Sequence, residues 1–270
     1  MQVNLNQLDI PKASAYAMQA LDIVTGETPD FKQLEQAIMH DPLLASSVLR
    51  YANSPLHRRA TEITNVPTAL KLLGLNSIKS AIVTATIRSL LPVDSHIGQT
   101  LLQHMLDVSI LCKLIGRQCC PADADDLEFL GLIHDVGMLT LAANYERTYD
   151  RLVHDAREQN IGIDQLEIDE FGVTHDTVTQ KTIDTFRLPK RYGELLKNFH
   201  TREAVSGINA SDDRDRCVLS LAHTLLDDME RACFPERMVE SRSELCALLQ
   251  LSEEQLQSFQ HTAGALLENS

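Results

Sequence analysis

The sequence predicts an all-α fold, and three observations support this. Apolar residues recur at the three-to-four-residue spacing of amphipathic helices along almost the whole chain. No stretch alternates strictly between polar and apolar residues, and no hairpin dipeptide joins two such stretches. Trp is absent and aromatic residues are only 4% of the 270, so Leu, Ala, Ile and Val must fill the core. Such a core suits helix packing better than a β-sandwich.

Three helices are predicted at the start of the chain, and polar residues mark two of their beginnings. The first covers about residues 11–24, and the second follows Asp30 and ends near His40. The third opens at "DPLLASSVLRYANS". There Asp41 can cap the helix, and Pro42 suits its first position because the N–H that proline lacks would have no helical partner.

Two more helices are predicted before the chain reaches a proline break. "VPTALKLLG" indicates a short helix that ends on Gly74, placed as the glycine that often follows a helix in left-handed backbone. "NSIKSAIVTATIRSLL" indicates the next helix, capped by Asn76 or Ser77 and ending before Pro92.

The second half of the chain is predicted to contain longer helices. A polar link over residues 92–99 precedes a helix over 100–119. "PADADD" then breaks the chain and places acidic residues at the N-terminus of a continuous helix over 123–143, where they favour the helix dipole. Further helices are predicted over residues 146–159, 163–170, 174–186, 189–200, 214–232, 243–249 and 252–267, with a polar loop over 201–213.

The polar link near residues 92–99 is the predicted seam of the chain. We expect an N-terminal helical lobe over residues 1–92, a helical core over 100–232 that holds most of the histidines, and a C-terminal helical extension over 233–270. No internal repeat or low-complexity segment interrupts this organisation.

Charge and cysteine usage restrict the partners and the compartment. The 24 basic and 38 acidic residues give a net charge of −14, which offers no general attraction for nucleic acid or anionic lipid. No stretch has the length and apolarity of a membrane span, and the first residues do not resemble a signal peptide. Six irregularly spaced cysteines are typical of reduced thiols. We therefore expect a cytoplasmic protein that binds neither nucleic acid nor membrane.

The most informative polar residues lie in the apolar stretch "LEFLGLIHDVGMLTLAANY". His134 and Asp135 stand side by side there, and burying two such groups is costly unless something satisfies them. His104 and His223 also lie in strongly apolar segments. Neutral imidazole and carboxylate are suitable ligands for divalent zinc, manganese or iron, gathered from several helices of a bundle. The alternative is that each histidine is a core residue bonded to a backbone carbonyl.

Five of the ten histidines are not part of this candidate site. We interpret them as core or surface residues: His40, His57, His96, His154 and His261.

Two sets of motifs resemble a known family. "LIHDVGML" resembles the His-Asp signature of the HD superfamily of metal-dependent phosphohydrolases. The N-terminal half resembles the HDOD branch, whose pattern is present here as Asp41-Pro42, Asn53-Ser54 and "ALKLLG" at residues 69–74. The resemblance extends over about residues 10 to 200 and implies an HD-domain-like helical bundle with an N-terminal helical lobe.

The resemblance also implies a set of metal ligands. His104 matches the first histidine of the HD pattern, and His134 with Asp135 matches the pair, with the aspartate bridging if two metals are bound. His175 and His200 are similar to the extra histidines that HD-GYP phosphodiesterases use for a second metal. The family's last ligand is an aspartate, and the matching segment "SLAHTL" has His223 instead, so the site would be less anionic.

Two departures from the related phosphodiesterases concern catalysis. Those enzymes commonly read His-Asp-x-Gly-Lys, with a lysine that can contact phosphate, whereas this chain has Met138 there. The Gly-Tyr-Pro loop of the HD-GYP branch has no counterpart, and "HTREAVSGINA" stands in its place. The sequence also contains no nucleophile elbow, P-loop or dinucleotide fingerprint, so it indicates no organic cofactor.

Three functions follow as expectations. The first is a regulatory protein of bacterial signal transduction that binds a signalling partner protein or a small ligand and carries a divalent metal. The second is a metal-dependent phosphohydrolase acting on a phosphoester or cyclic nucleotide. The third is a metal-free helical scaffold. The sequence assigns no catalytic residue and leaves the oligomeric state open.

Overall fold

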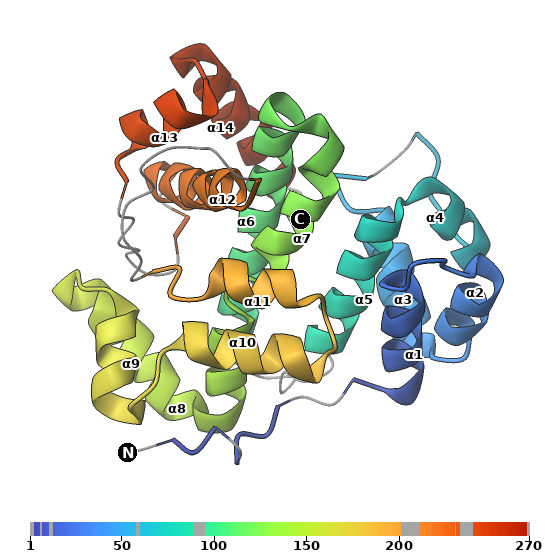
Figure 1. Cartoon of the computed structure of the whole chain (residues 1–270), viewed down its shortest axis with the longest axis horizontal. Coiled ribbons are helices and arrows are strands. Elements are labelled where there is room, and N and C mark those ends of the chain that lie inside the picture. Colours follow the sequence, from blue (N-terminus) through green and yellow to red (C-terminus); the bar gives the residue numbers. More distant parts are fainter. Residues whose placement is uncertain are drawn as a thin grey trace.

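The protein is helical throughout the part of the chain that the computed structural model describes (Figure 1). That part comprises residues 3–5, 7–10, 13–57, 60–88, 95–200, 211–229, 231–232 and 240–268. It contains no strand, which confirms the all-α prediction. None of its helices is long and apolar enough to cross a bilayer.

The first five helices form the N-terminal side of the molecule, shown in blue to teal in Figure 1. They are α1 (Ala15–Val24), α2 (Phe31–Met39), α3 (Pro42–Ala52), α4 (Val66–Leu72) and α5 (Leu75–Arg88). As predicted, Asp41 caps α3, and its carboxylate accepts hydrogen bonds from the N–H groups of Leu43 and Leu44. The predicted start of α1 at residue 11 is wrong. Ser14 caps that helix by accepting from the N–H of Ala17.

The predicted role of Gly74 is also wrong. The residue after α4 is Leu73 in extended backbone (ψ 136°), and Gly74 does not have a positive φ. Helix α5 begins immediately afterwards, and the Gly74 carbonyl accepts from the N–H of Ile78 in its first turn. Asn76 and Ser77, predicted as caps, therefore lie inside α5. An extended residue, not a left-handed glycine, makes the bend between the two helices.

The remaining helices include α6, which runs through the middle of the molecule (Figure 1). They are α6 (His96–Cys119), a short 3-10 turn (Pro121–Asp123), α7 (Ala124–Ile133), α8 (Val136–Gln159), α9 (Ile163–Phe171), α10 (His175–Thr185), α11 (Lys190–Leu196), α12 (Ser211–Asp228), α13 (Arg242–Leu249) and α14 (Glu253–Leu267). Helix α6 begins before the predicted residue 100, because Ser95 caps it. It packs against α7, α8, α12 and α14.

Buried apolar residues from α1 through α14 form one continuous core. The predicted division into a lobe, a core and an extension stays a prediction, because residues 92–94 of the proposed seam and residues 233–239 at the start of the extension lie outside the described residues. Of the predicted loop over residues 201–213, residues 201–210 also lie outside the described part, and the prediction is wrong for residues 211–213, which begin α12.

The predicted continuous helix over residues 123–143 is wrong at its centre. Helix α7 ends at Ile133, and α8 begins at Val136 after Asp135, whose φ of −110° and ψ of 23° are not helical. Helix α8 then continues beyond residue 143 to Gln159, with a kink at Tyr145. The two polar residues that looked costly inside a helix therefore occupy a break between two helices.

A glycine next to this break allows α10 to approach closely. A Cβ at Gly137 would collide with the carbonyl oxygen of His175 and lie 2.6 Å from the backbone nitrogen of Thr179. The N–H of Gly137 donates to Thr179 Oγ1 at 2.9 Å. Any larger residue at Gly137 would push α10 and His175 away from Asp135.

We therefore predict that Gly137→Ala lowers the free energy of unfolding by about 1–3 kcal/mol, as overpacking of a rigid contact does. Gly193→Ala is the matched control, because a Cβ there has no neighbour closer than 4.0 Å. Alanine in place of this helical glycine should stabilise the protein by about 0.5–1 kcal/mol. Urea denaturation of both variants checks this, and equal effects at the two positions would contradict the close approach of α10.

Candidate metal centre

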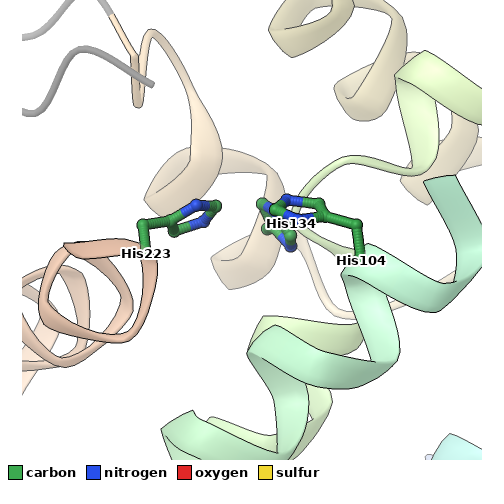
Figure 2. Close-up of side chains that lie close together, drawn as sticks. All are labelled: His104, His134 and His223. Carbon is green, nitrogen blue, oxygen red and sulfur yellow. The ribbon is translucent and has the colours of Figure 1, made fainter. Parts of the chain in front are cut away.

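Three histidines from three different parts of the chain meet at the centre of the molecule. His104 comes from α6, His134 follows α7 directly, and His223 comes from α12. Figure 2 shows His223 extending from its own helix toward the other two rings. One nitrogen of each ring lies within 4.8 Å of one nitrogen of each of the others, and all three side chains are buried. Three imidazoles at such spacing can face one metal ion.

A second group lies directly beside the first. It consists of Asp135, His175 at the first position of α10, and His200, which follows α11. One ligand atom of each again lies within 4.8 Å of the others. His175 Nε2 is 3.0 Å from His200 Nδ1.

Asp135 connects the two groups through its two carboxylate oxygens. Oδ2 lies 2.9 Å from His134 Nε2 and 3.6 Å from His104 Nε2. Oδ1 lies 3.6 Å from His175 Nε2 and 4.0 Å from His200 Nε2. A carboxylate with each oxygen facing a different set of imidazoles has the arrangement of a bridging ligand.

The buried polar atoms at this point fit a metal ion. Both carboxylate oxygens of Asp135 and the Nε2 atom of His134 are buried. Among the described residues, none of these three atoms has a hydrogen-bond partner of good geometry. Leaving a buried charge without such a partner is costly. Nitrogen and oxygen donors of this kind suit zinc, manganese or iron. When bound, such an ion would act as a Lewis acid and lower the pKa of a coordinated water.

The electrostatics of Asp135 are consistent with a ligand. Burial by itself raises the pKa of this carboxyl, but the neighbouring His134, His104 and His200 outweigh burial and hold the pKa well below its ordinary value. Asp135 is therefore an anion at neutral pH, which is the form that coordinates metal.

Three of the candidate ligands are oriented through their other ring nitrogen. His134 Nδ1 donates to the carbonyl of Gly131 at 2.7 Å. His175 Nδ1 lies 2.7 Å from Glu167 Oε2, and His200 Nδ1 lies 3.0 Å from Asp176 Oδ1. Metal-binding histidines usually make such a bond to a carbonyl or carboxylate, which fixes the ring and leaves the other nitrogen for the metal.

Sequence reasoning missed both orienting carboxylates. Asp176 follows His175 directly, so its position offered a weak signal. Glu167 lies in α9, a helix with several acidic residues, and nothing in its spacing distinguishes it from a surface residue. Its side chain is in fact fully buried, and it accepts hydrogen bonds from Tyr149 Oη and the backbone N–H of His175.

Glu167 also controls the charge of His175. Burial lowers the pKa of this imidazole, but the carboxylates of Glu167 and Asp176 outweigh burial and raise the pKa to about 9. A metal ion that binds His175 Nε2 would have to displace a proton.

We predict that Glu167→Gln weakens metal binding about 10- to 100-fold, the range found when an orienting partner of a ligand is removed. Glu170→Gln is the matched control, because Glu170 lies in the same helix and pairs with Arg151 at the surface. A competition titration with a chromophoric chelator measures both dissociation constants. Equal affinities would show that Glu167 does not support a metal ligand.

A polar cavity of about 250 Å³ reaches His104 and His223 from outside. Asp227 and Glu240 contribute carboxylates to its lining. The described basic side chain that lines it, Arg242, already bonds to Asp228 and Glu253, each at 2.6 Å. This lining does not favour the entry of a phosphate ester.

The structure brings together all six side chains that the sequence proposed as ligands. They are His104, His134, Asp135, His175, His200 and His223. Metal binding by them stays a prediction. Met138, which replaces the lysine of related phosphodiesterases, is completely buried in the apolar core.

The comparisons with known proteins agree with the all-helical fold. The family model described as the HDOD domain matches residues 10–202. No curated protein matches the chain.

Three solved structures share the fold. A candidate phosphohydrolase from Shewanella amazonensis SB2B has a TM-score of 0.73 at 15% identity, covering 97% of this chain and 96% of that one. An HDOD domain protein of unknown function from Geobacter sulfurreducens has a TM-score of 0.73 at 20% identity, covering 97% and 94%. A candidate signal transduction protein from Marinobacter aquaeolei VT8 has a TM-score of 0.73 at 15% identity, covering 99% of this chain and 61% of that one.

Proposed function

The chain belongs to the HDOD domain family, and on that premise we propose that it is a regulatory module of bacterial signal transduction that carries a divalent metal centre. The observation that carries this proposal is the position of Asp135 between two sets of histidines. The six side chains come from α6, the α7–α8 junction, α10, the turn after α11, and α12. A metal ion held there would cross-link five separate segments.

Such a cross-link would make the arrangement of these helices depend on metal occupancy. An ion that binds only the folded chain stabilises it by about 4 kcal/mol at a concentration 1,000 times its dissociation constant. The surfaces of α10 and α12 would then be held in one arrangement for a signalling partner or a small ligand. The net charge of −14 is a reason to expect neither nucleic acid nor anionic membrane as that partner.

The main alternative is a metal-dependent phosphohydrolase. It is favoured by the same carboxylate, because a bridging aspartate between two ligand sets is suited to two-metal hydrolysis. Three features count against it: the acidic lining of the approach, the paired state of Arg242, and the buried Met138 in place of a lysine. These features would bind an anionic substrate weakly, so we favour the regulatory function.

One experiment distinguishes the regulatory module, the phosphohydrolase and the metal-free scaffold. Protein loaded with manganese, iron or zinc is tested for hydrolysis of phosphomonoesters and cyclic dinucleotides, and its amide hydrogen exchange is compared with that of metal-free protein. We expect slower exchange in α10 and α12 on loading, with no turnover above a protein-free metal blank. Turnover that Asp135→Asn abolishes would establish the hydrolase instead. Identical exchange with and without metal would favour the metal-free scaffold.

A further inference from the structure

A second and larger cavity, of about 690 Å³, lies in the N-terminal half of the molecule. It is lined by residues of α3, α5, α6 and α7 and of the segment between α3 and α4. Helix α3 packs against α5, and α7 packs against both α5 and α6; Figure 1 shows where these helices lie. The size of the cavity is that of a pocket for a small organic molecule. Much of its wall is apolar, with Leu49, Leu56, Ile63, Leu106 and Ile110 contributing.

Two arginines lie at the rim of this cavity. Arg50 is in the last turn of α3, Arg88 is the last residue of α5, and both are exposed. Neither has a carboxylate within 4.0 Å among the residues that the structure describes. Both arginines line the same cavity. Partial burial, and then the charge of Arg50, lower the pKa of Arg88. Two neighbouring guanidinium groups without an acidic partner are suited to bind an anion between them.

The acidic side chains that line the cavity do not pair with the two arginines. Glu128 at the floor is already held by Lys113 at 2.6 Å and His57 at 3.0 Å, and it accepts a hydrogen bond from Tyr51. Glu62 lies on the lining and is exposed. The floor of the cavity is therefore neutralised, and its exposed lining, among the described residues, carries the two arginines against the single carboxylate of Glu62, which leaves a net positive charge.

The wall also contains polar groups that a ligand can use. Thr84 Oγ1 is buried and has no hydrogen-bond partner among the described residues. Asn53, part of the Asn-Ser pair of the HDOD pattern, fixes the wall through hydrogen bonds to the carbonyls of Leu49 and Ile63 and to the N–H of Ile63. The metal centre uses neither of these residues.

We propose that this cavity binds a small organic anion, with an apolar ring system inside and a phosphate, sulfonate or carboxylate group between Arg50 and Arg88. The proposal names a class of ligand for the proposed regulatory function. The regulatory role of this ligand rests on that function, whereas its binding to the cavity does not. Helices α6 and α7 carry both sites. Leu106 and Glu128 line the cavity, while His104 on α6 and His134 at the end of α7 belong to the metal centre.

The test uses two fluorescent probes that differ in charge. They are 8-anilinonaphthalene-1-sulfonate and its uncharged counterpart N-phenyl-1-naphthylamine, each titrated against the full chain in metal-free and metal-loaded form. We expect one saturable site for the sulfonate probe. In Arg50→Gln/Arg88→Gln its dissociation constant should rise about tenfold or more, as the loss of charge-assisted hydrogen bonds implies. The constant for the neutral probe should change less than about twofold.

Three further variants make the result decisive. Arg187→Gln, at an exposed arginine that pairs with Asp22, should bind both probes as the unaltered chain does. Leu106→Trp should fill the cavity and weaken both probes. Arg50→Lys/Arg88→Lys keeps the charge and should lie between the unaltered chain and the glutamine variant, which covers the case in which the glutamine variant does not fold. Unchanged sulfonate binding in the glutamine variant, or in Leu106→Trp, would overturn the proposal.

Measuring metal uptake alongside probe binding distinguishes a failure of this proposal from a failure of the proposed function. Saturable, arginine-dependent probe binding in protein that takes up no metal would support the cavity and count against the metal centre. Metal uptake without such binding would do the reverse.

Discussion

Asp135→Asn should weaken metal binding by about 100-fold or more, and His134→Ala should abolish it. The asparagine keeps the size of the side chain but removes the negative charge that lies 2.9 Å from His134 Nε2 and 3.6 Å from His175 Nε2. Removing an orienting partner alone costs 10- to 100-fold, and loss of a bridging ligand should cost at least the upper end of that range. Metal content after dialysis, with a chelator competition titration, measures the effect.

The control for these variants is His154→Ala. Its imidazole is 72% exposed, so the substitution removes a histidine without touching the buried cluster. It should bind metal as the unaltered chain does. If His134→Ala bound metal normally and only unfolded more easily, the histidines would be packing residues and the metal centre would be wrong.

Glu128→Ala should lower the free energy of unfolding by about 3–5 kcal/mol, the cost of breaking a buried ion pair by removing one partner. Glu128 is 1% exposed and bonds to Lys113 at 2.6 Å, to His57 at 3.0 Å and to Tyr51. Lys113 is 3% exposed and, among the described residues, would keep Asp125 as its one carboxylate partner, at 2.9 Å. Urea denaturation at pH 7 measures the loss.

An exposed pair provides the comparison. Arg151 and Glu170 lie 2.5 Å apart at the surface, with the arginine side chain 57% exposed. Glu170→Ala should cost no more than about 1 kcal/mol, as surface ion pairs do. A loss of similar size from both substitutions would show that the Glu128 network does not contribute as a buried charge cluster.

The pH dependence of Glu128 has a definite sign. Burial raises the pKa of this carboxyl, but His57 and Lys113 outweigh burial and lower the pKa below the ordinary value of 4.5. The carboxylate therefore stabilises the fold fully above about pH 4.5, and this contribution is lost as the pH falls through the lower folded-state pKa. The stability difference between the unaltered chain and Glu128→Gln should shrink below pH 4.5, and a difference that grows there would contradict the assignment.

Local sequence signals predicted most helices because capping and periodicity act over a few residues. The carboxylate of Asp41 marks the start of α3 by accepting from the backbone N–H groups of Leu43 and Leu44, and Pro42 occupies the first helical position. The break between α7 and α8 could not be predicted in this way, because the apolar pattern continues through it. At this break α10 approaches Gly137 closely, a contact between residues far apart in the sequence that no local pattern reveals.

The residues of the candidate site also fall into those that the sequence could predict and those that only the fold reveals. The six proposed ligands could be named from the sequence because the family resemblance supplies their positions. Glu167 and the two cavity arginines, Arg50 and Arg88, could not be identified in this way, because in the sequence they look like ordinary polar residues of amphipathic helices. Only the folded chain shows that Glu167 is buried against His175 and that the two arginines face one cavity.

The central claim, that Asp135 and five histidines form a metal centre, is tested most directly by elemental analysis of the purified full chain. The protein is purified without chelators, reconstituted with manganese, iron or zinc, and dialysed before its metal content is measured by mass spectrometry. We predict at least one tightly bound ion per chain, lost in His134→Ala and retained in His154→Ala. A chain that retains none of the three metals after reconstitution would contradict the account.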